Sequence, residues 1–166
     1  PPIPRWKHDR HGAGPDSRYD LLPNPNAYIV MPVQFSRGCP FNCEFCDIIE
    51  IYGRVPRTKT PAQITTELEA IHTLGFDGAV FLVDDNFIGN RAKALKLLGE
   101  IERWNSEHGC PFTYFTEASL NLADHPELLD AMARANVIFV FIGIETPDPI
   151  LLKAAQKYHN ASADPL

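Results

Sequence analysis

The sequence has no apolar run long enough to cross a membrane and no excess of basic residues. Its longest apolar run, Val137 to Ile142, falls far short of the ~20 residues that a transmembrane helix needs. No charged-then-apolar signal sequence opens the chain. The formal net charge is −6 and the pI is near 5.4, which argues against nucleic acid or an anionic membrane surface as a partner. We therefore expect a cytoplasmic protein that binds small molecules.

Cysteine is also scarce, with four residues in the whole chain. Three of them, Cys39, Cys43 and Cys46, lie so close together that each obstructs the disulfide geometry of the others. Reduced thiols are predicted, as in the cytoplasm. The first residue is Pro1 and not methionine, so we expect the sequence to be a piece of a longer protein.

Proline is unevenly placed, because ten of the fifteen prolines fall within the first 61 residues. Residues 1–27 show no usable period and are predicted to form a proline-rich linker, docked or free. The whole chain of 166 residues is 45% hydrophobic and 22% charged, which suits a single domain with a substantial core.

Strand and helix signals alternate from residue 28 onward. Capping boxes at Thr60/Gln63 and Asp124/Glu127 each predict a helix start, as does the pair Thr146-Pro147. Apolar runs favour parallel strands, and the run 137–142 is apolar throughout, as expected of a strand covered on both faces. The predicted strands are 28–35, 79–83, 112–116 and 137–142, and the helices begin near residues 60, 90, 124 and 146. Four βα units imply an α/β fold with a parallel sheet.

The spacing Cys-x-x-x-Cys-x-x-Cys points to a metal site. Three thiolates can hold a [4Fe–4S] cluster and leave one iron open for a ligand. The alternative is a structural zinc site, which requires four ligands, and no fourth lies nearby in the sequence. Cys110 precedes the third predicted strand, at the opposite end of a parallel sheet, so we expect it to be a buried structural thiol.

These cysteines, with Phe45 before the last one, resemble the signature of the radical S-adenosylmethionine (SAM) enzymes. The flanking residues 34–38 and 47–48 are similar to one branch that carries a cobalamin-binding domain and includes hopanoid methylases. The resemblance extends over residues 28–157. It implies a partial (β/α)₆ barrel with two strands missing, followed by a tail at 158–166.

Polar residues follow each later strand, and the resemblance implies that they bind SAM. Asp84 and Asp85 stand where the wider family carries its amino-binding motif, with the choice between them open. Glu117, Ser119 and Glu145 are candidates for contacts to the ribose or the amino group, and Phe45 for the adenine or the cluster. Competing interpretations are chain turns, an acid–base pair, and for Glu145 a favourable charge at a helix N-terminus. Arg54, Arg57 and Lys59 could meet a carboxylate or lie in a solvated loop.

The resemblance also implies the reaction. The cluster passes one electron to SAM, and the resulting 5′-deoxyadenosyl radical abstracts hydrogen from an unactivated carbon, for a cobalamin-dependent methylation. A small or lipid-like substrate and a reductant such as flavodoxin or ferredoxin are expected, and this chain alone is expected to be inactive. The alternatives are a cobalamin-free relative such as a methylthiotransferase, and a non-catalytic binding module stabilised by zinc or a cluster.

Overall fold

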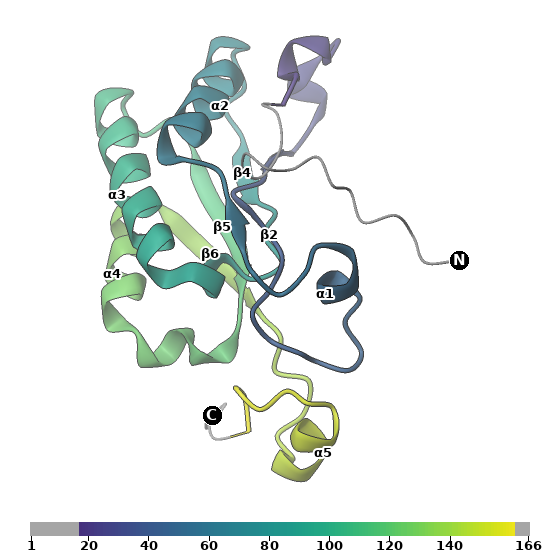
Figure 1. Ribbon diagram of the computed structural model, residues 1–166. Coiled ribbons are helices and arrows are strands. Elements are labelled where there is room, and N and C mark those ends of the chain that lie inside the picture. Colours follow the sequence, from purple (N-terminus) through teal and green to yellow (C-terminus); the bar gives the residue numbers. More distant parts are fainter. Residues whose placement is uncertain (1–16, 162–166) are drawn as a thin grey trace.

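The computed structural model describes residues 17–161 and contains a four-stranded parallel sheet (Figure 1). Its strands are β1 (Val30–Val33), β4 (Ala79–Leu82), β5 (Thr113–Ala118) and β6 (Val137–Ile142), side by side in this order. The predicted α/β class with a parallel sheet and four βα units is thereby confirmed. Most of the predicted linker lies outside the described residues.

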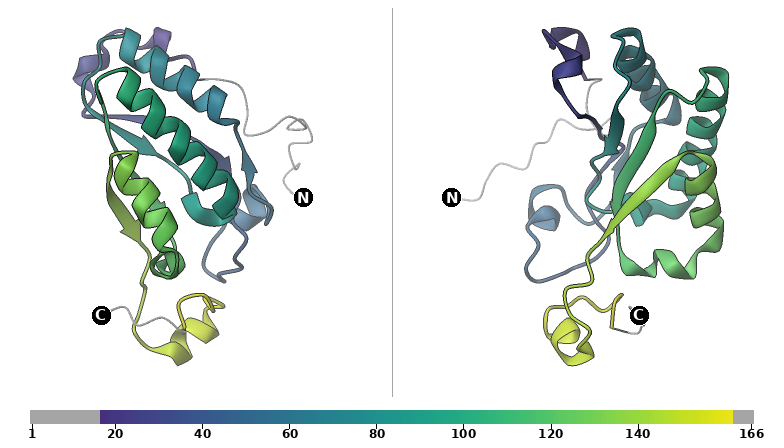
Figure 2. Two further views of the ribbon diagram at one scale, coloured as in Figure 1. Left: turned by 90° about the vertical axis from the view of Figure 1, so that its left-hand side faces the viewer. Right: turned by 180° about the vertical axis from the view of Figure 1, so that it is seen from behind.

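Three helices cover one face of the sheet (Figure 2). They are α2 (Pro61–Thr73), α3 (Arg91–Glu107) and α4 (Pro126–Arg134). The apolar stripes of α2 and α3 point inward, and Ile64, Leu68, Leu98 and Ile101 are fully buried. No helix between residues 17 and 161 is long and apolar enough to span a membrane.

The predicted start of α2 at Thr60 is confirmed, and all three helices end at a residue in the left-handed conformation. Thr60 caps α2 by accepting from the Gln63 N–H, and the Gln63 side chain returns a bond to the Thr60 N–H at 2.9 Å. Gly75, Gly109 and Asn136 follow the three helices with φ values of 75°, 74° and 64°. This left-handed conformation ends a helix, and it suits glycine and asparagine best.

Two predicted helix starts are wrong. Asp124 belongs to the short 3-10 helix η4 (Leu120–Asp124), and α4 begins two residues later with Pro126 and no side-chain cap. The last helix, α5 (Pro149–Ala154), is capped by Asp148, whose carboxylate accepts from the Ile150 N–H at 2.7 Å. In each case the helix begins at a proline further along the chain, Pro126 or Pro149, because proline lacks an N–H and suits the first helical position.

Strand β6 is less covered than expected. It forms one edge of the sheet, and Ile138 and Phe139 are 68% and 53% exposed. Phe141, on the same strand, packs against Phe115 of β5 with ring centroids 6.1 Å apart, on the face opposite the helices. The apolar run 137–142 therefore does not mean burial on both faces here. Leu129 of α4 is also exposed.

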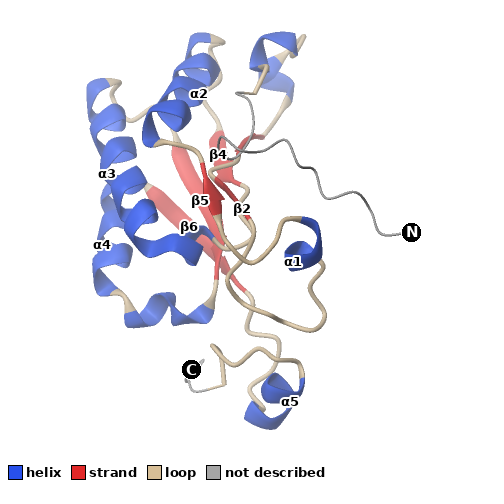
Figure 3. Cartoon of the chain, viewed as in Figure 1, coloured by secondary structure: helices blue, strands red, loops and turns tan. Residues whose placement is uncertain are grey.

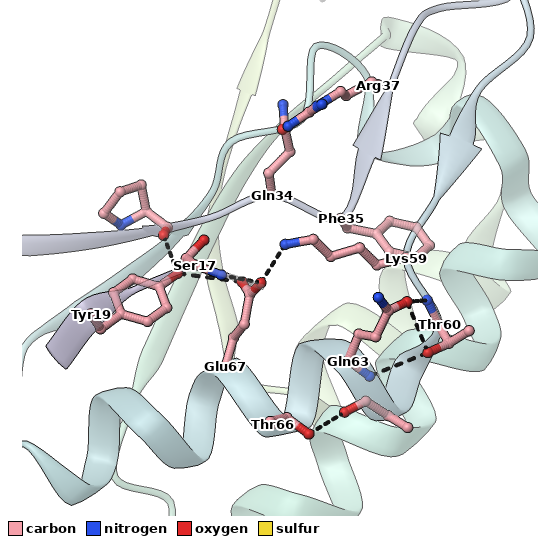
Figure 4. A network of polar contacts seen from close by, with 12 residues as sticks. Ser17, Tyr19, Gln34, Phe35, Arg37, Lys59, Thr60, Gln63, Thr66 and Glu67 are labelled. Atoms are coloured by element: carbon pink, nitrogen blue, oxygen red, sulfur yellow. Dashed lines mark hydrogen bonds and ion pairs between the residues drawn. The ribbon is translucent and has the colours of Figure 1, made fainter. Parts of the chain in front are cut away.

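A buried ion pair joins α2 to the segment that precedes it (Figure 4). Lys59 and Glu67 are 4% and 1% exposed and form a short ion pair. Glu67 also accepts from the Ser17 N–H, and the hydroxyl of the buried Tyr19 donates to the Pro32 carbonyl at 2.7 Å. Lys59 is therefore not part of a solvated loop, and the end of the predicted linker is docked on the domain.

This ion pair gives a stability prediction. Replacing Lys59 with Met leaves the Glu67 carboxylate buried without its counter-ion, and we expect a loss of about 3–5 kcal/mol in the free energy of unfolding. The control is Arg103→Met, which breaks an exposed pair with Glu100 and should cost less than about 1 kcal/mol. Urea denaturation measures both, and equal losses in the two variants would contradict the prediction.

Candidate cofactor site at the carboxyl ends of the strands

The three cysteines lie on one long loop, residues 38–56, at the carboxyl end of β1 (Figure 3). A short antiparallel ribbon closes it, formed by β2 (Ser36–Arg37) and β3 (Arg57–Thr58), and its interior carries the single turn α1 (Ile48–Ile51). Gly38 opens the loop with φ 98°, and a Cβ there would stand 2.7 Å from the Gly53 carbonyl oxygen. Only glycine therefore allows the two sides of the loop to approach.

All three loop cysteines are free and half-buried. Burial raises the pKa of the Cys39 thiol, and the nearby charges of Cys46 and Asp85 raise it further. The side-chain amide of Asn86, 3.9 Å from the Cys39 sulfur, lowers this pKa. Burial likewise raises the pKa of Cys43, while Lys157 lowers it. The thiols are thus near enough to feel one another's charge, so a cationic centre among them would stabilise all three as thiolates.

The arrangement of donors distinguishes between kinds of metal site. Within residues 17–161, no three His, Cys, Asp or Glu side chains gather closely enough to hold a single metal ion. A closed zinc site needs four ligands on one ion, whereas an iron–sulfur cube is ligated at separate irons. The cysteine loop fits a cluster better than zinc. Cys110 lies before β5, away from this loop, and it is exposed, so the prediction of a buried thiol is wrong.

Asp84 has a structural role. It is 1% exposed, and its two carboxylate oxygens accept hydrogen bonds from the backbone N–H groups of Phe35 and Ser36. Burial raises the pKa of this carboxyl to about 7, although both N–H donors favour the ionised form. Asp84 therefore ties the end of β4 to the start of the cysteine loop, and its side chain does not reach outward as a cofactor contact would require.

Asp85 has the opposite environment. Its Oδ2 atom is buried and has no hydrogen-bond partner among the described residues. Burial raises the pKa of Asp85, and the Gly38 backbone, next to Cys39, lowers it. The Asp85 charge also raises the pKa of both Cys39 and Glu117, so it lies near the cysteine loop and near the end of β5. An unpaired buried carboxylate oxygen is costly, and an ammonium group would satisfy it.

Asn86 links two parts of the site. Its amide nitrogen faces the Cys39 sulfur, and its carbonyl oxygen accepts from the Ser119 N–H at 3.3 Å. The Ser119 hydroxyl donates to Asn121 at 2.6 Å. Ser119 is 8% exposed and is held beside Asn86 by the bond from its N–H, and its role in cofactor binding stays a prediction. In the sequence, the position of Asn86 directly after two aspartates at the end of a strand is the feature that indicates a place in the site.

The other candidates are placed less closely together. Glu117 is exposed at the end of β5. Partial burial of its carboxylate, and to a lesser degree the charge of Asp85, raise its pKa. Glu145 adopts φ 66° and forms an ion pair with Lys157 at 2.5 Å, so it is neither at the start of α5 nor free to be a base. Phe45 is 59% exposed and is therefore not core, and the Lys157 ammonium lies 5.6 Å from its ring centroid.

Comparison with known proteins gives the class. The sequence profile of the Radical SAM superfamily matches residues 33–163. The chain therefore belongs to the radical SAM superfamily, as its cysteine motif indicated, and the cofactors of this class are a [4Fe–4S] cluster and SAM.

Individual relatives narrow the class further. The chain is 54% identical over 146 residues to an uncharacterized methyltransferase of Synechocystis, and 50% identical over 133 residues to the hopanoid C-2 methylase of Rhodopseudomonas palustris. These matches cover 88% and 80% of the chain but only 27% and 25% of the relatives. The chain thus spans about a quarter of their length.

Solved structures share the fold. The radical SAM methyltransferase TsrM from Kitasatospora setae superposes with a TM-score of 0.65 at 22% identity, over 74% of this chain and 23% of that one. The cobalamin-dependent radical enzyme OxsB superposes with a TM-score of 0.66 at 20% identity, over 80% of this chain and 21% of its own. The four-stranded sheet is therefore a partial barrel of the radical SAM type.

The two adjacent aspartates should differ in their effect on stability. Asp84→Ala leaves two buried backbone N–H groups without an acceptor, at about 1–3 kcal/mol each. Asp85→Ala removes a carboxylate with an unpaired oxygen, and its effect on the free energy of unfolding should stay within about 1 kcal/mol. Chemical denaturation of both variants tests this difference, and a larger loss in Asp85→Ala would overturn the assignment of Asp84 to the fold.

Proposed function

We propose that residues 28–157 form the cluster- and SAM-binding part of a cobalamin-dependent radical SAM methyltransferase, with residues 1–27 as the linker that precedes it. The observation that carries this proposal is the unpaired oxygen of Asp85, placed beside a loop of three reduced cysteines at the carboxyl ends of the strands. In parallel β/α folds this is the edge where ligands bind.

Cys39, Cys43 and Cys46 are the proposed ligands of the cluster. Three thiolates leave the fourth iron open, and SAM can chelate it through its amino and carboxylate groups. When bound, the cluster and SAM together supply a carbon-centred radical able to take hydrogen from an unactivated carbon. The protein's part is to hold the thiolates, orient SAM and exclude water from the reacting atoms.

Asp85 is the proposed acceptor for the SAM ammonium, because its free oxygen lies next to the loop that bears Cys39. A charge-assisted hydrogen bond there would use an oxygen that the fold leaves unpaired. Glu117 is accessible at the same edge and suits a ribose hydroxyl, with Ser119 behind it. Phe45, exposed between two cysteines, can cover the adenine or the cluster.

The proposed reaction is methylation, because the relatives at 54% and 50% identity are named a methyltransferase and a methylase. The name of one gives hopanoid as its substrate, which favours a lipid-like substrate for this protein too. Cobalamin would be bound by a domain outside this chain, and a flavodoxin or ferredoxin in the cytoplasm would supply the electron.

Single Ala variants of the loop cysteines test the ligand assignment. Cys43→Ala should remove most of the bound iron and sulfide after anaerobic reconstitution, because no described residue can replace the lost thiolate. Cys110→Ala is the matched control and should keep the iron content and the visible absorption of the cluster. The assignment is wrong if both variants lose iron equally, or if the wild-type protein binds equimolar zinc without sulfide.

A further inference from the structure

A second segment of the chain is hydrogen-bonded to the cysteine loop. It comprises residues 155–159, which follow α5 and which we call the clamp segment. The Glu44 N–H donates to the Ala155 carbonyl at 3.0 Å, and the Asn42 side-chain amide donates to Gln156 at 2.6 Å. Asn42 and Gln156 are 114 positions apart in the sequence, so these bonds join two distant parts of the chain directly at Cys43.

Aromatic residues on both sides of Cys43 also contact the clamp segment. The rings of Phe41 and His159 are stacked, with centroids 3.6 Å apart and an interplanar angle of 12°. On the other side, the Lys157 ammonium faces the ring of Phe45, which immediately precedes Cys46. Every residue from Phe41 to Phe45 other than Cys43 itself thus contacts the clamp segment. The three thiols form no disulfide.

The clamp segment is itself fixed to the end of β6. Lys157 is 7% exposed and paired with Glu145, and the buried Asn160 donates to the Gly143 carbonyl at 2.8 Å. A Cβ on Gly143 would stand 2.9 Å from both the Lys157 ammonium and the Glu145 carboxylate, so the glycine makes room for this ion pair. The clamp segment therefore links the cysteine loop to the end of β6.

We infer that the clamp segment is a positioning element for the cluster: Gln156 and His159 hold the cysteine loop in the spacing that the cluster requires, and Lys157 sets a positive charge beside it. This inference rests on the proposed function of the cysteines. Partners behind the ligands orient them and tune the metal, and their loss commonly lowers metal affinity. A fixed cation beside a cluster also stabilises its more negative, reduced form.

The test compares three variants after reconstitution. Gln156→Ala removes the bond to Asn42, and we expect it to lose iron to a chelator about 10-fold faster than wild type. Lys157→Met removes the ammonium and leaves the Glu145 carboxylate without its partner, so the surroundings of the loop become more negative. The midpoint potential of the cluster should therefore fall, as measured by a redox titration followed by electron paramagnetic resonance. Lys153→Met, on the exposed side of α5, is the charge-matched control and should leave both quantities unchanged. Wild-type iron loss in Gln156→Ala together with a wild-type potential in Lys157→Met would overturn the inference.

A second arm needs no cluster. In the apoprotein, alkylation of Cys43 followed by mass spectrometry reports how firmly the loop is held, with the exposed Cys110 as the internal reference. Gln156→Ala and the loop-side variant Asn42→Ala should both speed alkylation of Cys43 relative to Cys110, and the double variant should add nothing further. An unchanged ratio in both single variants would refute the clamp even if the wild type binds a cluster. Faster alkylation in a protein that binds no iron would keep the clamp and refute the proposed function.

Discussion

The carboxylate of Asp84 is the contact on which the arrangement of the site depends. By accepting from the backbone of both Phe35 and Ser36, it fastens the end of β4 to the first residues after β1. The ribbon of β2 and β3 starts at this point and closes the cysteine loop. The neighbouring Asp85 is thereby fixed beside that loop with one oxygen unpaired. The adjacent aspartates thus differ, since Asp84 is hydrogen-bonded within the fold while Asp85 keeps one buried oxygen without a partner among the described residues.

The cysteine loop is held from two directions. On one side it is tied to the sheet through Asp84 and the close approach of Gly38 to Gly53. On the other side it meets the clamp segment, which the end of β6 carries. Such loops have little hydrophobic core of their own, so their geometry depends on specific polar and aromatic contacts. A loop fixed at both sides can present three thiolates in one arrangement, which metal sites with a defined cofactor require.

The parallel sheet and the position of the site could be predicted from the sequence, because both follow from short-range signals. The capping box at Thr60 and the residues after each helix behaved as local rules require. The helix starts near Asp124 and Thr146 were misplaced, since a proline further along competed for the first position. The roles of Asp84, Lys157 and Gln156 could not be predicted, because each contact joins residues far apart in the sequence. The exposure of β6 depends on what lies next to it in space, which an apolar pattern does not encode.

The central claim is that Asp85, and not Asp84, meets the amino group of SAM beside the cysteine loop. Calorimetry of SAM binding to the anaerobically reconstituted protein tests it most directly, with Asp85→Ala compared with wild type at equal iron content. Loss of a charge-assisted hydrogen bond should weaken binding by about 1.5–3 kcal/mol, or roughly 10- to 150-fold. Wild-type affinity in Asp85→Ala, with its cluster intact, would contradict the account.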